Sequence, residues 1–599
     1  MKKIRVTLFI ISTAFALLFQ NSAKAQTAMI NVYGRNSINL NGNWKVVIDP
    51  FDIGLGDWAA IYKDRKPKGK TDFVEYSFDL GPSLSIPGDF NSQLPELNYY
   101  ESSVWYKKTF QYAPHENNRL FIHFGAVNYL ADVFINGKNL GRHEGGFTPF
   151  QFELTDYVVE GENTIIVRAN NARRKDGIPG IGFDWFNYGG ITRDVHLIQT
   201  PEAFIEDYSI QIDKKDISQI KGYIKVNPAV PDKEISLDIP ELKIIQKLLT
   251  NAQGFAPFSL KAKVNLWTPE NPKLYAVHLI CNNDTVSDHI GFRTIEVLGT
   301  DILLNGKPIF LRGVNIHEEI PQRKARAYSV ADAQVLLNWA IELGCNFVRL
   351  VHYPHNEHTI RLAEKLGLLV WEEIPVYQGI DFTDVQMKGK MELMIKEMIY
   401  RDKNRCNVII WSMANETSPS RVRDESLIEL AEKARRIDNS RLITAAFDNV
   451  QYTDNRITLT DTVMKHMDVI SVNEYLGWYK AWPKSPGDVT WENTLNKPLI
   501  ISEFGGEALF NNEDGVPDVA STWSEDYVAQ IYLNQIKMFK SIPFLRGTCP
   551  WILADFRSPG RMHPVYQKGW NRKGLLSDRG DRKKAWYVIR KYYEGLISK

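Results

Sequence analysis

At 599 residues the chain is too long for a single hydrophobic core, and it is expected to hold about three or four domains. Its 72 Lys and Arg side chains nearly match its 71 Asp and Glu side chains. The resulting net charge of +1 argues against a protein that binds nucleic acid or an anionic membrane through its overall charge.

Residues 1–25 have the layout of a secretory signal peptide. Lys2, Lys3 and Arg5 precede an apolar stretch at 6–19, and Ala23-Lys24-Ala25 provides a small-x-small cleavage site. The apolar stretch is shorter than the roughly 20 residues that a membrane-spanning helix needs. The sequence contains no second long apolar segment. We therefore expect cleavage after Ala25, export to the periplasm or the medium, and no membrane span.

Residues 26–200 show short strands of alternating polar and apolar residues, without helical periodicity. Examples are 103–110, 119–124 and 131–137, the last of which ends in Asn136-Gly137. An Asn-Gly pair between two such strands is typical of a tight β-hairpin. We predict a jelly-roll-like β-sandwich for this region.

Residues 201–297 continue with short strands on a smaller scale, which is typical of an immunoglobulin-like sandwich of about 100 residues. Cys281 in this region is one of four cysteines, and the others are Cys345, Cys406 and Cys549. Their spacing matches no metal-binding motif. Cys345 and Cys549 lie in or beside apolar strands, which favours buried thiols. A disulfide remains an alternative, because an exported protein meets an oxidising environment.

From residue 298 to 599 the pattern changes to strands that alternate with helices. The expected strands are 310–315, 347–350, 368–374, 408–416, 443–447, 469–475, 498–505 and 547–556. Helices are expected at 329–344, 357–367, 426–438 and 524–541. Eight strands in about 300 residues predict a (β/α)8 barrel. A doubly wound open sheet is the alternative, but no glycine-rich phosphate loop follows the first strand.

Two of these strands run into a glutamate, one into Glu416 and the other into Glu503. The carboxyl ends of barrel strands form the mouth at which catalytic groups lie. By this count the glutamates end strands four and seven, nearly opposite in the ring, so their side chains can converge. Two facing carboxylates are what glycoside hydrolysis requires, and Asn415 stands where its amide can bond a sugar hydroxyl. The alternative is that each glutamate caps a helix or pairs with a surface base.

These strand ends and the order of β-sandwich, immunoglobulin-like sandwich and barrel resemble family 2 of the glycoside hydrolases. The stretches that carry the resemblance also include Pro87-Gly-Asp-Phe90, Val133-Phe-Ile-Asn-Gly137, Arg312-Gly-Val-Asn-Ile-His317 and Val348-Arg-Leu-Val-His-Tyr-Pro354. The resemblance implies a sugar-binding-like sandwich at 26–200, Glu416 as general acid/base and Glu503 as nucleophile of a retaining double displacement. Such a mechanism predicts carboxyl groups about 5–5.5 Å apart, with the proton held on Glu416 by repulsion from Glu503.

Asn571-Arg572-Lys573 follows the last expected strand. Because residues two apart in an extended segment point the same way, Asn571 and Lys573 can grip one substituent while Arg572 points elsewhere. An amide and an ammonium suit a carboxylate, such as the C6 group of a uronic acid. This arrangement resembles that of the β-glucuronidases within the family. The substrate contacts that the resemblance implies are Asp184, His352, Asn473, Tyr475, Tyr479, Trp551, Asn571 and Lys573.

Several alternatives stay open at this site. Basic residues crowd 557–582, so a solvated basic loop is one alternative, and a role for Arg561 as a second carboxylate ligand is undecided. Trp551 could belong to the core, and Tyr479 could merely pack on its neighbour. Only about 25 residues, 375–400, follow strand three, which favours an open mouth that takes oligosaccharide ends or bulky aglycones.

The sequence predicts an exported, retaining exo-β-glucuronidase that acts on a uronic-acid-terminated glycan or a glucuronide. A β-galacturonidase would need the same contacts to the C6 carboxylate. A β-galactosidase would leave Lys573 without a carboxylate partner on the sugar. Outside the enzymes, a non-catalytic carbohydrate-binding protein is the alternative. No motif for a metal, a cofactor or nucleic acid is present. The aglycone and the oligomeric state, a homo-oligomer included, are left open.

Overall fold

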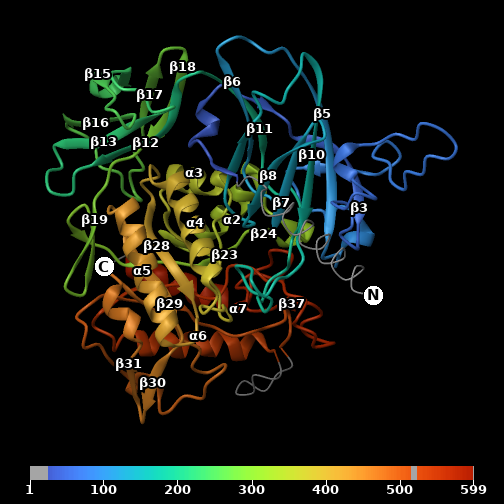
Figure 1. Ribbon diagram of the computed structural model, residues 1–599. Coiled ribbons are helices and arrows are strands. Elements are labelled where there is room, and N and C mark those ends of the chain that lie inside the picture. Colours follow the sequence, from blue (N-terminus) through green and yellow to red (C-terminus); the bar gives the residue numbers. More distant parts are fainter. Residues whose placement is uncertain (1–24, 514–522, 598–599) are drawn as a thin grey trace, which may run out of the picture. The chain divides into compact units, whose positions relative to one another are not determined.

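The computed structural model describes residues 25–513 and 523–597. Residues 1–24 of the expected signal peptide therefore lie outside the described residues. The chain forms two compact units, which are described separately (Figure 1). The first contains Asn36–Ala172, Gly189–Glu202 and the residues up to Ala28. The second contains Met29–Arg35, Arg173–Tyr188 and the rest of the chain from Ala203.

The first unit is a β-sandwich, as the sequence predicts. One sheet has the order β1-β9-β6-β11-β2 and the other β4-β3-β5-β10-β7-β8. The strands are β1 Gln26–Thr27, β2 Ile38–Asn39, β3 Gly42–Asp49, β4 Ser83–Ile86, β5 Ser103–Tyr112, β6 Asn118–Phe124, β7 Leu130–Ile135, β8 Lys138–Glu144, β9 Phe150–Glu153, β10 Gly161–Asn170 and β11 Val195–Pro201. Alternate residues of these strands, such as Val104 and Tyr106 of β5, fill the core between the sheets. The predicted hairpin is confirmed, because Asn136 and Gly137 turn β7 into β8 with positive φ angles.

The second unit begins with an immunoglobulin-like sandwich of a three-stranded and a four-stranded sheet, in the orders β12-β13-β16 and β15-β14-β17-β18. The strands are β12 Phe204–Ile212, β13 Gln219–Asn227, β14 Glu234–Ile239, β15 Ile244–Leu249, β16 Phe255–Lys261, β17 Tyr275–Cys281 and β18 Asp284–Ile290. Their inward side chains are mainly Ile, Val and Leu, which suit a half-buried pleated surface. The predicted sandwich is confirmed.

The barrel follows. Its sheet has the order β22-β35-β34-β32-β29-β28-β27-β26-β23, and every pairing is parallel. The strands are β22 Leu311–Arg312, β23 Asn315–His317, β26 Phe347–Val351, β27 Leu369–Glu373, β28 Val408–Asn415, β29 Leu442–Phe447, β32 Ile470–Asn473, β34 Leu499–Glu503 and β35 Leu545–Thr548. β22 and β23 are the two halves of the first predicted strand, and they pair with β35 and β26 respectively. The nine segments therefore make eight barrel strands that close on themselves, as predicted.

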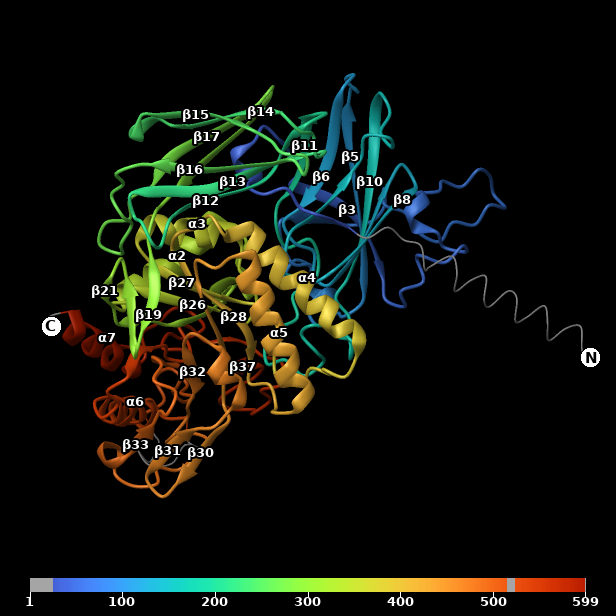
Figure 2. The same cartoon turned by 60° about the vertical axis from the view of Figure 1, so that its left-hand side comes forward.

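Helices cover the outside of these strands (Figure 2). They are α2 Val330–Glu342, α3 Glu357–Leu366, α4 Val385–Asp402, α5 Arg421–Ile437, α6 Glu525–Phe539 and α7 Lys584–Ile597. The four predicted helices are confirmed, but α4 and α7 were not predicted. Most of the segment 375–400 forms α4, which is capped by the Asp384 carboxylate at the Gln386 amide.

Smaller elements complete the second unit. Between β29 and β32 the described chain has no α-helix but a short 3-10 helix, Thr462–His466. β30 Val450–Thr453 and β31 Arg456–Leu459 form a hairpin in the same segment, and β31 also pairs with β33 Thr490–Glu492. The remaining strands are β19 Ile295–Leu298, β20 Asp301–Leu304, β21 Lys307–Pro308, β24 Glu319–Ile320, β25 Ala325–Arg326, β36 Phe556–Arg557 and β37 Trp570–Asn571. All four cysteines are buried and unpaired, so the prediction of buried thiols is confirmed. Within the described residues, no helix is both long and apolar enough to cross a bilayer.

Candidate active site

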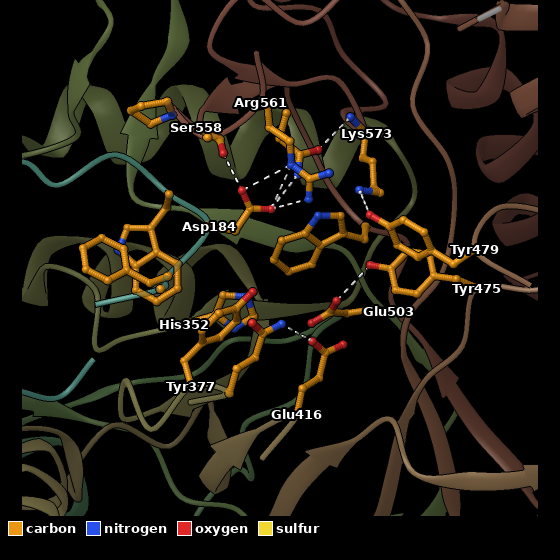
Figure 3. Close-up of a pocket in the computed structure, with 18 of the residues that line it drawn as sticks. Asp184, His352, Tyr377, Glu416, Tyr475, Tyr479, Glu503, Ser558, Arg561 and Lys573 are labelled. Atoms are coloured by element: carbon orange, nitrogen blue, oxygen red, sulfur yellow. Dashed lines mark hydrogen bonds and ion pairs between the residues drawn. The ribbon is translucent and has the colours of Figure 1, made fainter. Parts of the chain in front are cut away.

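The two predicted glutamates lie at the carboxyl ends of their barrel strands. Glu503 is the last residue of β34, and Glu416 follows β28 directly. Both line one pocket of about 820 Å³ (Figure 3). The pocket is lined by Arg173, Gly182, Phe183, Asp184, Trp185, His352, Tyr377, Gln378, Glu416, Tyr475, Tyr479, Glu503, Trp551, Ser558, Pro559, Gly560, Arg561, Asn571 and Lys573.

Glu503 is held by a buried arginine. One carboxylate oxygen of Glu503 accepts a hydrogen bond from Nη1 of Arg349 at 2.8 Å, and the other accepts one from the Tyr475 hydroxyl at 2.9 Å. Arg349 lies on β26 and is itself fixed by the Glu373 carboxylate, at 3.0 Å from Nε, and by Oδ1 of Asn415, at 2.8 Å from Nη2. Two donors on a buried carboxylate orient it and favour its ionised form.

Glu416 adopts a left-handed backbone conformation, with φ near 50°, as the chain leaves β28. Its amide donates to the Ala446 carbonyl at 2.9 Å, which helps hold this uncommon conformation. The side chain then accepts two amide hydrogen bonds. Nε2 of Gln378 donates to Oε2 at 2.9 Å, and Nδ2 of Asn473 donates to Oε1 at 2.8 Å. Both oxygens of the carboxyl group are therefore positioned by neighbouring strand ends.

The two carboxyl groups influence each other's protonation. The pKa of Glu503 is raised to about 8, chiefly by burial; the charge of Arg349 opposes this shift and the charge of Glu416 adds to it. One proton is thus kept near neutral pH, which is the state that an acid and a nucleophile need together. The expectation that this proton lies on Glu416 stays a prediction.

A cluster of charges faces the glutamates across the pocket, with Asp184, Arg561 and Lys573 on the side opposite Glu416 in Figure 3. The guanidinium of Arg561 donates to Asp184, at 3.2 Å from Nε to Oδ2, and to Oε1 of Glu507 at 3.3 Å. The Lys573 ammonium donates to the Tyr479 hydroxyl at 2.8 Å and lies 3.4 Å from the same Glu507 oxygen.

Asn571 and Lys573 both reach the pocket, whereas Arg572 turns away, as the two-residue period predicts. Nδ2 of Asn571 donates to Asp184 at 3.3 Å. Arg572 instead pairs with Asp555 at 3.2 Å and with Asp578 at 3.0 Å, neither of which lines the pocket. The alternative of a uniformly solvated basic loop does not fit this stretch, because Asn571, Arg572 and Lys573 are all buried.

The charges of this cluster are nearly balanced. Burial opposes ionisation of Asp184, but the hydrogen bonds and charge of Arg561 outweigh it and lower the pKa of this carboxyl. Burial likewise opposes ionisation of Glu507, and Lys573 and Arg561 help to lower its pKa. Burial would raise the pKa of Tyr479, yet the same two cations lower it. Two cations thus face two carboxylates that stay ionised.

Aromatic rings line another part of the pocket. The His352 ring stacks on Trp551, with centroids 4.9 Å apart, and lies 4.8 Å from the Tyr377 ring. Burial lowers the pKa of His352, although Nδ1 lies 2.8 Å from the Glu373 carboxylate. An aromatic face of this kind suits the apolar side of a pyranose ring.

The structure brings together most of the predicted site residues. Asp184, His352, Glu416, Tyr475, Tyr479, Glu503, Trp551, Asn571 and Lys573 line the pocket. Asn415 and Asn473 do not line it and instead hold Arg349 and Glu416. Nδ2 of Asn415 is buried without a hydrogen-bond partner among the described atoms.

Sequence reasoning missed several residues of the site. Arg349, Tyr377, Gln378, Glu507 and Ser558 were not predicted, and Arg561, which was left undecided, lies in the pocket. A signal existed for Arg349, because a charged residue inside an apolar strand needs a buried partner. Across the described residues, no group of three or more His, Cys, Asp or Glu side chains could hold a metal ion.

Comparison with known families agrees with this geometry. The model of the glycosyl hydrolases family 2 TIM barrel domain matches residues 295–594, which is half of the chain. The family 2 sugar binding domain matches 38–201, and a further family 2 domain matches 203–293. The chain belongs to glycosyl hydrolase family 2. The resemblance inferred from the sequence is confirmed, and the chain is a glycoside hydrolase.

Individual relatives of this family 2 enzyme are similar at low identity. A putative β-glucuronidase of Formosa agariphila is 28% identical over 570 residues, which cover 85% of this chain but only 66% of that protein. The β-glucuronidase of Rattus norvegicus is 27% identical over 602 residues, covering 90% of each chain. The structure of the Ruminococcus gnavus β-glucuronidase in complex with D-glucuronic acid superposes with a TM-score of 0.79 at 25% identity, covering 95% of this chain and 99% of that one.

Proposed function

We propose that this family 2 hydrolase removes terminal β-linked glucuronic acid from a glycan or a glucuronide. The observation that carries the proposal is Lys573, which is 2% exposed and faces the pocket from the side opposite the two glutamates. A buried ammonium aimed into a sugar pocket is suited to a carboxylate ligand. The β-glucuronidases named above support the same assignment.

The sugar would lie between the aromatic wall and the charge cluster. Its C6 carboxylate would accept hydrogen bonds from Lys573, Asn571 and Arg561, all of which line the pocket. Asp184 lines the pocket beside these donors and would accept from a ring hydroxyl in exchange for one of its bonds to Arg561, Ser558 or Asn571.

The chemistry follows from the carboxylate pair. Glu503 would attack the anomeric carbon while the bond to the leaving oxygen breaks and Glu416 gives that oxygen its proton. Glu416, now ionised, would take a proton from a water that attacks the same carbon and breaks the bond to Glu503. The product is the free uronic acid with retained configuration, and both glutamates return to their starting protonation. Arg349 and Tyr475 would hold the nucleophile throughout.

One experiment tests the sugar: nitrophenyl β-glucuronide, β-galacturonide and β-galactoside offered side by side to the wild-type enzyme. We expect the highest kcat/KM for the glucuronide. Preference for the galacturonide would still support contacts to the C6 carboxylate, but would assign the enzyme to sugars with the other configuration at C4. Preference for the galactoside would refute the role of Lys573, and turnover of none of them would favour a carbohydrate-binding protein.

Export is proposed as well, on the layout of residues 1–25 alone. Expression of the full chain in a bacterial host, followed by fractionation and N-terminal sequencing, should give a periplasmic or secreted protein that starts at Gln26. A cytoplasmic protein with an intact N-terminus would contradict the proposal.

A further inference from the structure

The first unit contains a second pocket, which has no part in the catalytic site. It has a volume of about 190 Å³ and lies between β3 and the long connection 50–82 that leads to β4. The connection covers the outer face of the sheet, where Trp105, Phe134 and Ile166 form a small core with Ile61 and Phe78. Figure 2 shows the connection, in blue near β3, extending away from the strands. A long connection that packs its own apolar side chains against a sheet and borders an accessible pocket is typical of a binding loop.

Three aromatic side chains on the pocket wall face solvent. Phe51 is 84% exposed, Trp58 70% and Phe73 81%. Large exposed aromatic rings gathered around a cavity mark a binding surface rather than part of a folded core. Flat aromatic faces beside a cavity of this size suit the rings of a sugar chain.

One stretch of this connection is positively charged, although the connection 50–82 as a whole contains six Asp and Glu against five Lys and Arg. Residues 63–70 contain five Lys and Arg against one Asp, whereas the whole chain has a net charge of +1. Arg65, which lines the pocket, pairs with Asp72 at 2.7 Å, and this pair closes the tip of the loop. Lys68 and Lys70 are exposed and lie within that tip; the Lys68 amide donates to the Asp72 carboxylate at 3.0 Å, but neither ammonium group forms an ion pair in the described part of the chain.

Acidic side chains offset part of this charge at the base of the loop. Asp64 pairs with Lys107, and Asp79 pairs with Lys66 at 2.6 Å. Glu75 lines the pocket, and a buried Asp49 is occupied by backbone amides and the Trp105 indole. Residues 63–70 therefore keep a positive excess, whereas the charged residues that line the pocket are Asp49, Arg65 and Glu75.

We propose that this pocket and the loop 63–70 form a non-catalytic binding site for an acidic polysaccharide. Phe51, Trp58 and Phe73 would stack on sugar rings, and Lys68 and Lys70 would pair with carboxylate or sulfate groups along the same chain. Charge complementarity selects an anionic glycan over a neutral one. The family model that matches this region is that of a sugar binding domain, which favours a glycan over a second copy of the protein. Such a site holds a polymer on the enzyme and raises the local concentration of its chain ends.

The inference goes beyond the proposed function and shares with it only the anionic character of the glycan. Binding can therefore be measured without turnover. Electrophoresis of the native full-length protein in gels that contain polygalacturonate, dextran sulfate or neutral dextran is the test. We expect retardation by at least one anionic polymer, weaker retardation at high ionic strength, and none by dextran. Retardation by polygalacturonate alone identifies carboxylates as the ligand groups, and retardation by dextran sulfate alone identifies sulfates.

Variants locate the binding. Single Ala substitutions of Phe51, Trp58 and Phe73 should each weaken retardation about two- to tenfold, and the triple variant should abolish it. Leu80→Ala is the matched control, because Leu80 is 91% exposed in the same connection but does not line the pocket. It should bind as the wild type does. All these variants should keep the wild-type kcat/KM on a small nitrophenyl substrate, which also shows that they fold.

Charge is tested in the same way. The double variant Lys68→Glu/Lys70→Glu should lose retardation, whereas Lys261→Glu/Lys263→Glu, an equal change at exposed sites of the other unit, should not. Lys573→Met should still be retarded, which separates this site from the catalytic pocket. Unchanged retardation of the triple aromatic variant, or equal retardation by dextran, would overturn the proposal. Self-association that the triple variant abolishes would show an interface between copies and would overturn it too.

Discussion

Lys573→Met removes the ammonium that the proposed function assigns to the substrate carboxylate while keeping an unbranched apolar stem. Lys573 is 2% exposed, and its Nζ lies 3.4 Å from Oε1 of Glu507. The variant would therefore leave a bound uronate facing Glu507 with only Arg561 and Asn571 to compensate. Truncating one member of such a buried pair costs about 2–5 kcal/mol, or roughly 30- to several-thousand-fold in kcat/KM.

The assay compares kcat/KM on nitrophenyl β-glucuronide with that on a neutral β-galactoside or β-glucoside that the wild type turns over slowly. We expect the loss on the glucuronide alone, with the neutral sugars unaffected or improved. Lys568→Ala is the control, because Lys568 is exposed in the same basic stretch and does not line the pocket. An equal fall on charged and neutral sugars would refute the uronide assignment, since a general folding defect lowers both.

Three further predictions concern the carboxylate pair. Glu503→Gln should retain less than about a tenth of wild-type turnover while the thermal unfolding midpoint shows an intact fold, because an amide cannot form the covalent intermediate that the proposal assigns to the Glu503 carboxylate. Glu416→Gln should reduce turnover of alkyl or sugar glycosides far more than that of activated nitrophenyl glycosides, since acid assistance is worth about 10²–10⁴-fold on poor leaving groups; equal losses would contradict its role. The pKa of Glu503 is raised to about 8, so its carboxyl should lose its proton above that pH; because a retaining pair needs one proton for its acid, the kcat/KM of the wild type should fall there. Glu416→Gln should lack this alkaline fall in a pH profile, and an unchanged profile would argue against a role of Glu416 in it.

Much of the fold could be predicted because its signals are local. Continuous apolar runs indicated the buried parallel strands, and the Asn136-Gly137 turn identified a hairpin from two residues. Helix α4 was missed although Met387, Met391, Met394 and Met398 follow helical spacing and are buried. The polar residues between these methionines make the helical spacing hard to recognise in the sequence. The hairpin β30–β31 lies where the alternation of strands and helices in a barrel predicts a helix. The composition of this segment does not indicate the hairpin.

The position of the two glutamates at the barrel mouth could be predicted because each one ends its own strand, which is a local property. The residues that position the pair are different, because their partners are remote in sequence. Arg349 contacts Glu503 across 154 residues, and Gln378 contacts Glu416 across 38. A spacing pattern within one segment cannot indicate such pairs; they depend on which strand ends the barrel brings together.

The charge cluster leads to a last prediction about how the uronate is recognised. Because Arg561 and Lys573 already face Asp184 and Glu507, the empty cluster has almost no net charge, and a uronate would add a third carboxylate. Recognition must then rest on short, directed hydrogen bonds rather than on a long-range positive field. Buried contacts of this kind are screened little by salt. We therefore expect kcat/KM for the glucuronide to change little between low and high NaCl concentrations, measured at constant pH. A steep fall with salt would show that an exposed positive surface steers the substrate and would contradict a balanced, buried site.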